Sequence, residues 1–239
     1  MVYRPPPESP WLLRFRLQDL LFTHWPVPVA VLERVLPGPL AIDTFEDRAW
    51  VSVVSLTVTD LRVRWLPSLP NVFNTMQVNV RTYVTMDGDR GVFFLSIDTA
   101  NILAAWGARR FFHLPCFHSR ISCSKGGDPV EFSSNRRGSP AELMVQYRPG
   151  NESFQAARGS LDEWLLERYR LYSADTRGRL WRGDIHHAPW SLRPVEAEVV
   201  NNTMTLGHGI AAPTSRPLFH FTPGLETLAG PLQRLKDDL

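Results

Sequence analysis

The clearest pattern along the chain is an alternation of side chains between residues 76 and 84. Met, Val and Thr occupy the even positions, whereas the odd positions carry polar or aromatic side chains. Successive side chains of a β-strand point to opposite faces, so this period predicts a strand with one apolar and one polar face. A turn at residues 86–89 and a second run up to Asp98 then predict a β-hairpin.

A two-residue loop and a four-residue loop both place the same residues of the two strands on the same face of this hairpin. With either loop, Asn79 is expected near Ser96 and Gln77 near Asp98. One face of the hairpin is therefore expected to be apolar, and the other to combine polar side chains of both strands. The polar face carries Gln77, Asn79, Arg81, Tyr83, Ser96 and Asp98.

Two interpretations of this polar face are open. It is either the water-exposed side of an antiparallel sheet or the wall of a ligand cavity. Exposed strand faces usually carry Lys, Glu and Thr, whereas Asn, Arg, Tyr and Asp offer directional hydrogen-bond donors and acceptors. Phe94 on the same face also argues against full exposure to water.

Several short strands and about three helices are predicted elsewhere, which indicates an antiparallel α+β fold. The first folded element is expected at residues 15–22, and Pro28 opens a short helix that Pro37 and Gly38 end. Residues 40–45 and 49–59 are expected to pair as a hairpin, with a bulge at Val53 and Val54. Further strands are expected at 117–123, 130–134, 143–147, 180–185 and 195–200.

Two helices have more specific signals. Thr99 is expected to cap a helix through about Arg110 whose buried stripe contains Ile102, Leu103 and Trp106. Ser160 and Glu163 form a capping box, which begins a helix whose apolar face is expected to continue to Tyr172. Arg168 falls inside that stripe, so it either extends to the edge or enters an interior polar site with an acidic or carbonyl partner.

The composition is that of a folded globular protein, with 239 residues, 44% of them apolar and 21% charged. The net charge of +2 is too small to predict binding to nucleic acid or to an anionic membrane surface. No apolar stretch is long enough to span a membrane and no signal-peptide core is recognisable, so a cytoplasmic location is expected. We expect a flexible N-terminal arm at residues 1–14 and a single domain at 15–239.

No motif predicts a metal or a cofactor. His113, Cys116, His118 and Cys123 lie close together but lack the spacing of a zinc site. Residues 207–212 match a G-x-G-x-x-A dinucleotide pattern, yet no βαβ unit surrounds them. Hydrolase, NTPase and metalloprotease motifs are missing from the sequence.

Five separated blocks of residues together resemble the bacterial YqjF-like proteins, a family of unknown function. The resemblance runs from about Phe15 to Phe221. That family is similar in fold to acetoacetate decarboxylase, which implies an antiparallel, partly closed β-barrel or cone with helices outside and a cavity within. In such a fold, the face with Asn79, Arg81 and Tyr83 would line the cavity. The blocks are 43–45, 79–84, 91–94, 167–172 and 187–190.

The chain departs from acetoacetate decarboxylase in its lysines. That enzyme forms a Schiff base through an amine of lowered pKa, but 24 of the 26 basic residues here are Arg. Neither Lys125, in a turn, nor Lys236, in the tail, matches the role, and Arg is not nucleophilic. Schiff-base decarboxylation is therefore not expected.

These observations predict a protein that binds a small molecule. One hypothesis is an enzyme that acts on a small anionic or carbonyl metabolite. Asp98 and His187 are the candidates for proton transfer. Two alternatives stay open, namely a ligand sensor or carrier without turnover and an oligomeric interaction module rich in aromatic residues. The candidate ligand-binding residues are Gln77, Asn79, Arg81, Tyr83, Asp98 and Arg168.

Overall fold

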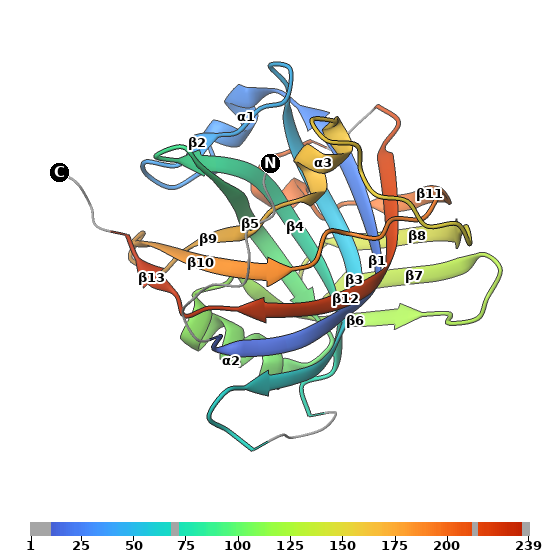
Figure 1. Ribbon diagram of the computed structural model, residues 1–239, viewed down its shortest axis with the longest axis horizontal. Helices are drawn as coiled ribbons and strands as arrows, with labels where there is room; N and C mark the ends of the chain where they lie inside the picture. Colours follow the sequence, from blue (N-terminus) through green and yellow to red (C-terminus); the bar gives the residue numbers. More distant parts are fainter. Residues whose placement is uncertain (1–10, 68–71, 212–214, 236–239) are drawn as a thin grey trace.

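The computed structural model describes residues 11–67, 72–211 and 215–235. Within these residues the chain forms one sheet of thirteen strands, three α-helices and a short 3-10 helix at Leu206–His208 (Figure 1). The helices are α1 (Val29–Glu33), α2 (Ile102–Phe112) and α3 (Leu161–Leu166). The strands are β1 (Leu13–Val27), β2 (Ala41–Ile42), β3 (Ala49–Val63), β4 (Thr75–Met86), β5 (Asp89–Thr99), β6 (Cys116–Cys123), β7 (Val130–Arg136), β8 (Glu142–Pro149), β9 (Arg170–Ala174), β10 (Leu180–His187), β11 (Val195–Asn202), β12 (Leu218–Ala229) and β13 (Gln233–Arg234).

Five long strands form the part of the sheet that positions the candidate site. They lie in the order β12, β1, β3, β4 and β5, and each neighbouring pair is antiparallel. Strands β12 and β1 lie side by side although they come from opposite ends of the chain (Figure 1). The sheet is not antiparallel throughout, because β5 pairs in parallel with both β6 and β9. The structure thus confirms a mostly β fold with few helices and corrects the expectation of a purely antiparallel sheet.

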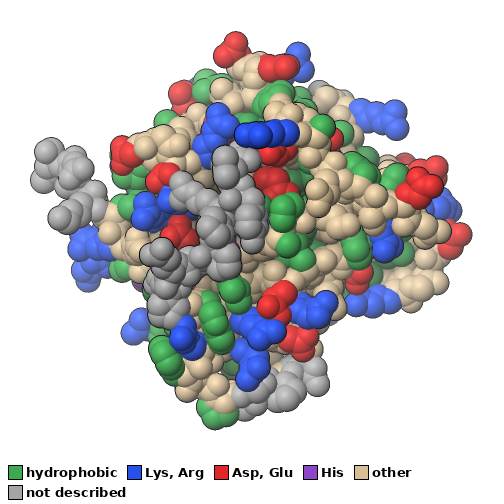
Figure 2. All heavy atoms as spheres, viewed as in Figure 1, with side chains coloured by type: hydrophobic (Ala, Val, Ile, Leu, Met, Phe, Trp, Pro, Cys, Tyr) green, Lys and Arg blue, Asp and Glu red, His purple; other side chains and the backbone are tan. Residues whose placement is uncertain are grey.

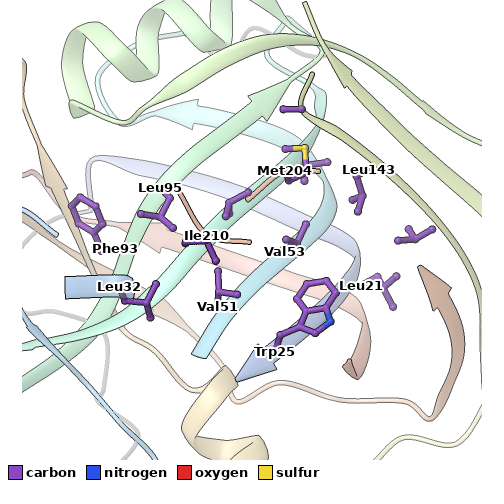
Figure 3. Close-up of a cluster of buried hydrophobic side chains, with 14 of the residues drawn as sticks. Leu21, Trp25, Leu32, Val51, Val53, Phe93, Leu95, Leu143, Met204 and Ile210 are labelled. Carbon is purple, nitrogen blue, oxygen red and sulfur yellow. The ribbon is translucent and has the colours of Figure 1, made fainter. Parts of the chain in front are cut away.

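Both faces of this sheet are packed. One face contributes Leu21, Val51, Val53 and Leu95 to an apolar cluster, where side chains from β1, β3, β5 and β8 point toward one another (Figure 3). The opposite face contributes Phe22, Trp50 and Phe94 to a second cluster, closed by residues of α3 and by Trp190. Alternate residues of β1 and β3 therefore enter different clusters, as the period of two requires.

Helix α2 has the opposite orientation to the one predicted. Its apolar residues Ile102, Leu103 and Trp106 are 59%, 58% and 57% exposed, and the buried side of the helix is formed by Ala105. Asn101 caps the helix by accepting hydrogen bonds from the backbone N–H groups of residues 103 and 104, so Thr99 is not the cap. The periodicity identified the helix, but small alanine side chains pack closest to the sheet.

Other sequence predictions differ in pairing or extent. The expected hairpin of residues 40–59 is wrong, because β2 pairs with β4 and not with β3. Pairing of β3 with β4 is continuous through Val53 and Val54, so no bulge occurs there. Ser160 caps α3 as predicted, but the helix ends at Leu166 and the expected apolar stripe continues as β9. The sequence also missed β12, a strand of 12 residues.

The predicted N-terminal arm overlaps β1, which begins at Leu13. Residues 1–10 of that arm, and Lys236, lie outside the described residues. In the described part of the chain, every helix falls short of the length and apolarity needed to cross a bilayer. Basic and acidic side chains are interspersed over the face shown in Figure 2.

Candidate functional site

A row of polar residues crosses the face of the sheet beneath α3. His24 of β1 lies opposite Ser52 of β3, and Ser52 in turn lies opposite Arg81 of β4. Asn79 and Tyr83 are two residues on either side of Arg81 and therefore point to the same face. These five residues, His24, Ser52, Asn79, Arg81 and Tyr83, are called the Arg81 cluster below.

Three members of the cluster share hydrogen bonds. Ser52 Oγ lies 2.6 Å from His24 Nδ1 and 2.6 Å from Tyr83 Oη, and Tyr83 Oη lies 3.2 Å from the same His24 nitrogen. If His24 Nδ1 carried the proton, the two hydroxyl groups would be left with one acceptor too few within the described residues. The tautomer in which Nδ1 accepts gives both hydroxyl groups an acceptor and carries the proton on Nε2. His24 Nε2 is buried and has no hydrogen-bond partner among the described residues.

His24 is neutral near pH 7. Complete burial lowers its pKa well below the ordinary value, and the nearby His220 and Arg81 lower it further. The ring of His220 lies 5.3 Å from that of His24, and His220 Nε2 contacts the carboxylate of Asp162 in α3 at 3.0 Å. The neutral imidazole of His24 therefore lies near the Arg81 cation and, in the tautomer that gives both hydroxyl groups an acceptor, presents an N–H group at Nε2.

Arg81 has no acidic partner among the described residues. Its Nε and Nη2 atoms are buried without a hydrogen bond, as is Oδ1 of Asn79. The guanidinium lies over the rings of Phe22 and Tyr83, at 5.4 and 6.0 Å. Buried polar groups in folded proteins nearly always have partners, so these atoms of Arg81 and Asn79 have unused hydrogen-bonding capacity within the described residues.

Arg168 is also buried on this side of the sheet, but it is paired. Its Nη1 atom donates to Asp43 Oδ2 at 2.6 Å, and its Nε atom donates to the backbone oxygen of Trp164 at 2.7 Å. Burial lowers its pKa, and Asp43 opposes that effect. Arg168 lies 4.9 Å above the ring of Tyr83. Of the two alternatives for Arg168, the interior polar position with an acidic partner is confirmed.

The Arg81 cluster is covered by aromatic side chains. Trp164 of α3 lies 4.7 Å from the ring of Tyr83, and Trp190 lies 5.7 Å from the ring of Phe22. On the outer side of Trp164 is a cleft of about 310 Å³, which also contains Arg90. The interpretation of this face as a solvated surface is therefore wrong, because Tyr83 is fully buried and Asn79 is half-buried. The cleft is lined by Thr44, Phe45, Glu46, Arg90, Gly159, Ser160, Glu163 and Trp164.

Asp98 lies on the other face of the sheet. A register shift in β5 pairs Asn79 with Ile97 and Val78 with Asp98, so the predicted proximity of Gln77 to Asp98 is wrong. Asp98 accepts hydrogen bonds from Ser119 and from Arg136, whose Nη2 lies 2.6 Å from its Oδ2. The structure therefore does not bring this carboxylate to the Arg81 cluster.

Two other candidates lie at the margin of the site. Gln77 shares the face of Asn79 and pairs in register with Leu56 and Thr99. His187 is buried between Tyr169 and Trp190, with ring distances of 4.7 and 4.6 Å. Burial lowers the pKa of His187. Trp190 thus contacts both the ring of His187 and, at 5.7 Å, the ring of Phe22 beside Arg81.

Sequence reasoning missed His24 and Ser52. Both lie within apolar strands, in runs that read as ordinary core. A signal was present, because each is a single polar residue on the face that also carries Phe22 or Trp50. Recognising it would have required knowledge of how β1 pairs with β3.

The cysteine and histidine segment shows no metal centre. Among the described residues, no three His, Cys, Asp or Glu side chains are grouped so as to hold a metal ion. Cys116 is buried, which raises the pKa of its thiol to about 12. At neutral pH it is a protonated, packed side chain.

Comparison with known proteins confirms the resemblance inferred from the sequence. The model of DUF2071, a family of uncharacterized conserved proteins, matches residues 14–226. The uncharacterized protein YqjF of Bacillus subtilis (strain 168) is 42% identical over 229 residues, which cover 95% of this chain and 94% of that protein.

Solved structures show the same fold at low identity. Acetoacetate decarboxylase from Legionella pneumophila is 13% identical with a TM-score of 0.64, over 95% of this chain and 88% of that one. The enduracididine biosynthesis enzyme MppR, complexed with pyruvate, is 10% identical with a TM-score of 0.67, over 96% of this chain and 92% of that one. The fold is thus similar to that of acetoacetate decarboxylase.

Proposed function

We propose that this chain, which belongs to the DUF2071 family of uncharacterized conserved proteins, binds a small anionic or carbonyl metabolite at the Arg81 cluster. The observation that carries this proposal is the Arg81 guanidinium, whose buried Nε and Nη2 atoms have no partner among the described residues. A bound anion supplies the missing charge and accepts both hydrogen bonds. Charge-assisted bonds of this kind contribute about 1.5–3 kcal/mol each.

The surroundings of Arg81 favour a small ligand. Phe22 and Tyr83 flank the guanidinium, and Trp164 separates the cluster from the cleft beside α3. Movement of the Trp164 ring would join the cleft to the cluster and admit a ligand of a few carbon atoms. The partly closed barrel or cone implied by the family resemblance, with a cavity within, belongs to this proposal.

The proposed chemistry does not use a Schiff base. Lys125 is 60% exposed and lies 3.4 Å from Asp19, so its ammonium is a solvated surface group. A solvated, ion-paired ammonium group is a poor nucleophile. Arg81 and Arg168 would instead bind and polarise the ligand.

Both turnover and simple binding are compatible with this site. The fold neighbours include enzymes, one of them in complex with pyruvate, a small oxo carboxylate, which supports an enzyme. His24 is the group best placed for proton transfer, because it lies in the same cross-strand row as Arg81, whereas Asp98 lies on the opposite face and the ring of His187 packs against Tyr169 and Trp190. A sensor or carrier would use the same contacts without turnover.

Native mass spectrometry of gently purified protein tests the proposal. A co-purifying anion is expected in the wild type, and its occupancy is expected to fall at least tenfold in Arg81→Met. Arg62→Met, at an exposed position of β3, serves as the matched control and should keep the ligand. Equal occupancy in wild type and Arg81→Met would contradict the proposal.

One observation favours a second function, an interaction module. The exposed apolar residues Ile102, Leu103 and Trp106 of α2 form a surface that typical monomers do not leave uncovered. Neither nucleic acid nor a membrane is proposed as the partner, in line with the small net charge. Light scattering at micromolar concentration checks for a homo-oligomer, and a strictly monomeric protein would contradict self-association.

A further inference from the structure

Two arginines, Arg136 and Arg81, differ in the hydrogen-bond partners of their Nε and Nη2 atoms. Arg136 donates from Nε to Asp98 Oδ1 at 2.9 Å and from Nη2 to Asp98 Oδ2 at 2.6 Å. This is the two-point contact that a planar carboxylate makes with a guanidinium. In Arg81 the same two atoms are buried and unpartnered within the described residues. The free edge of Arg81 therefore matches a carboxylate in both geometry and charge.

The neighbouring groups define what lies next to that carboxylate. In the tautomer whose Nδ1 accepts from the Ser52 and Tyr83 hydroxyl pair, His24 Nε2 is a donor. Asn79 Oδ1 is an acceptor, also buried and unpartnered in the described structure. His24 and Arg81 lie in one cross-strand row, and Asn79 is two residues from Arg81 on the same face. A ligand on the free edge of Arg81 would therefore have a second donor and one acceptor on the same face of the sheet.

A hydroxyl group satisfies both requirements, since it accepts one hydrogen bond and donates another. A keto oxygen accepts from His24 but leaves Asn79 Oδ1 without a donor. A methylene group satisfies neither. An unsatisfied buried polar atom costs more than a missing favourable contact, so the difference between these ligands is expected to be large.

We propose that the Arg81 cluster selects a short-chain 2-hydroxycarboxylate, with the carboxylate on the Nε and Nη2 edge of Arg81 and the hydroxyl between His24 Nε2 and Asn79 Oδ1. This inference rests on the proposed function and specifies its ligand class. Arg81 provides charge neutralisation, whereas Asn79 provides the discrimination between hydroxyl and keto oxygens. His24 and Asn79 are binding residues in this proposal, and no covalent step is required.

Calorimetric titration with lactate, pyruvate and propanoate tests the inference, because these three-carbon acids differ only at the second carbon. Lactate is expected to bind about tenfold more tightly than pyruvate and more tightly still than propanoate. Both enantiomers of lactate are titrated separately. In Asn79→Leu the advantage of lactate over pyruvate is expected to disappear, while in Arg81→Met all three acids should lose measurable binding.

The controls separate this inference from the broader proposal. Arg62→Met, at an exposed position of β3, should keep the preference for lactate. Equal, Arg81-dependent binding of all three acids would overturn the hydroxyl assignment and leave anion binding in place. Failure of lactate to bind the wild-type protein would also overturn the hydroxyl assignment. The broader proposal of anion binding is tested separately, by the native mass spectrometry described above. Thermal melts of each variant establish that it is folded.

Discussion

Arg136 donates hydrogen bonds from Nε and Nη2 to the two carboxylate oxygens of Asp98, at distances of 2.9 and 2.6 Å. Asp98 is fully buried and Arg136 nearly so. On the opposite face of the same sheet, Arg81 presents the corresponding edge without a carboxylate from the described chain. One arginine is therefore a satisfied part of the core, and the other is expected to be satisfied by a ligand.

Replacement of Asp98 by Asn is expected to lower the free energy of unfolding by about 3–5 kcal/mol, because it leaves Arg136 buried beside a neutral group. Urea unfolding measures this change. The double variant with Arg136→Met should recover much of the loss. Retention of wild-type stability by Asp98→Asn, with loss of an enzymatic activity, would instead favour a catalytic role for Asp98.

Replacement of Arg81 by Met is expected to leave the stability of the ligand-free protein unchanged or higher by about 1 kcal/mol. The reason is that two buried, unpaired nitrogen atoms of a partly exposed side chain are removed, a trade of function for stability that binding sites often show. Arg168→Met is the matched comparison, since it removes the buried partner of Asp43, leaves that carboxylate only the 3.5 Å contact with the more exposed Arg90 and should cost about 3 kcal/mol or more. Urea unfolding of both variants checks this, and similar losses in the two would argue against a vacant ligand edge at Arg81.

Acid should destabilise the protein through His24. Its pKa is lowered in the folded state, so the unfolded chain binds more protons below the ordinary value of 6.5. Stability is therefore fully present above that pH and falls as the pH decreases, by up to about 1.4 kcal/mol per pH unit for this residue. His24→Gln should show a shallower decline between pH 6.5 and 5.

Gly224 is expected to tolerate no side chain. Its φ is +113°, and an added Cβ would lie 1.9 Å from the backbone oxygen of Leu17 across the pairing of β1 with β12. Gly224→Ala should lower stability by about 3 kcal/mol or more. Gly107→Ala in α2, where a Cβ meets no atom within 4 Å, should raise stability by about 1 kcal/mol. Thermal unfolding compares the two, and a neutral Gly224→Ala would contradict the tight approach of β1 and β12.

Both cysteine thiols should react slowly in the folded protein. Burial raises the pKa of Cys116 to about 12 and also raises that of the half-buried Cys123. The thiolate is the reactive form, so a disulfide reagent at pH 8 should modify the native protein many-fold more slowly than the unfolded chain. Rapid modification of Cys116 in the native state would show that its segment opens.

The local elements followed from the sequence to the extent that neighbouring residues determine them. The period of two over β4 placed Asn79, Arg81 and Tyr83 on one face, and the structure confirms this. The capping pair at Ser160 and Glu163 correctly located the start of α3. These signals succeed because side-chain alternation and helix caps depend on residues a few positions apart.

The register and the long-range contacts of the strands could not be predicted from these local signals. The register shift in β5 moved Asp98 to the opposite face, and a one-residue shift has that effect on every later side chain. The end of α3 at Leu166 placed Arg168 beside Asp43, which is 125 residues away in sequence. Packing of long-range neighbours outweighed the helical periodicity at residues 167–172.

The sequence by itself determined a mostly β chain, a polar strand face centred on Arg81 and a shortage of lysine for Schiff-base chemistry. Only the tertiary structure decided that His24 and Ser52 join that face and that Arg81, unlike Arg136 and Arg168, has no carboxylate from the described chain. The physical reason is that strand periodicity is a local property, whereas the pairing of a buried charge depends on which distant strands become neighbours.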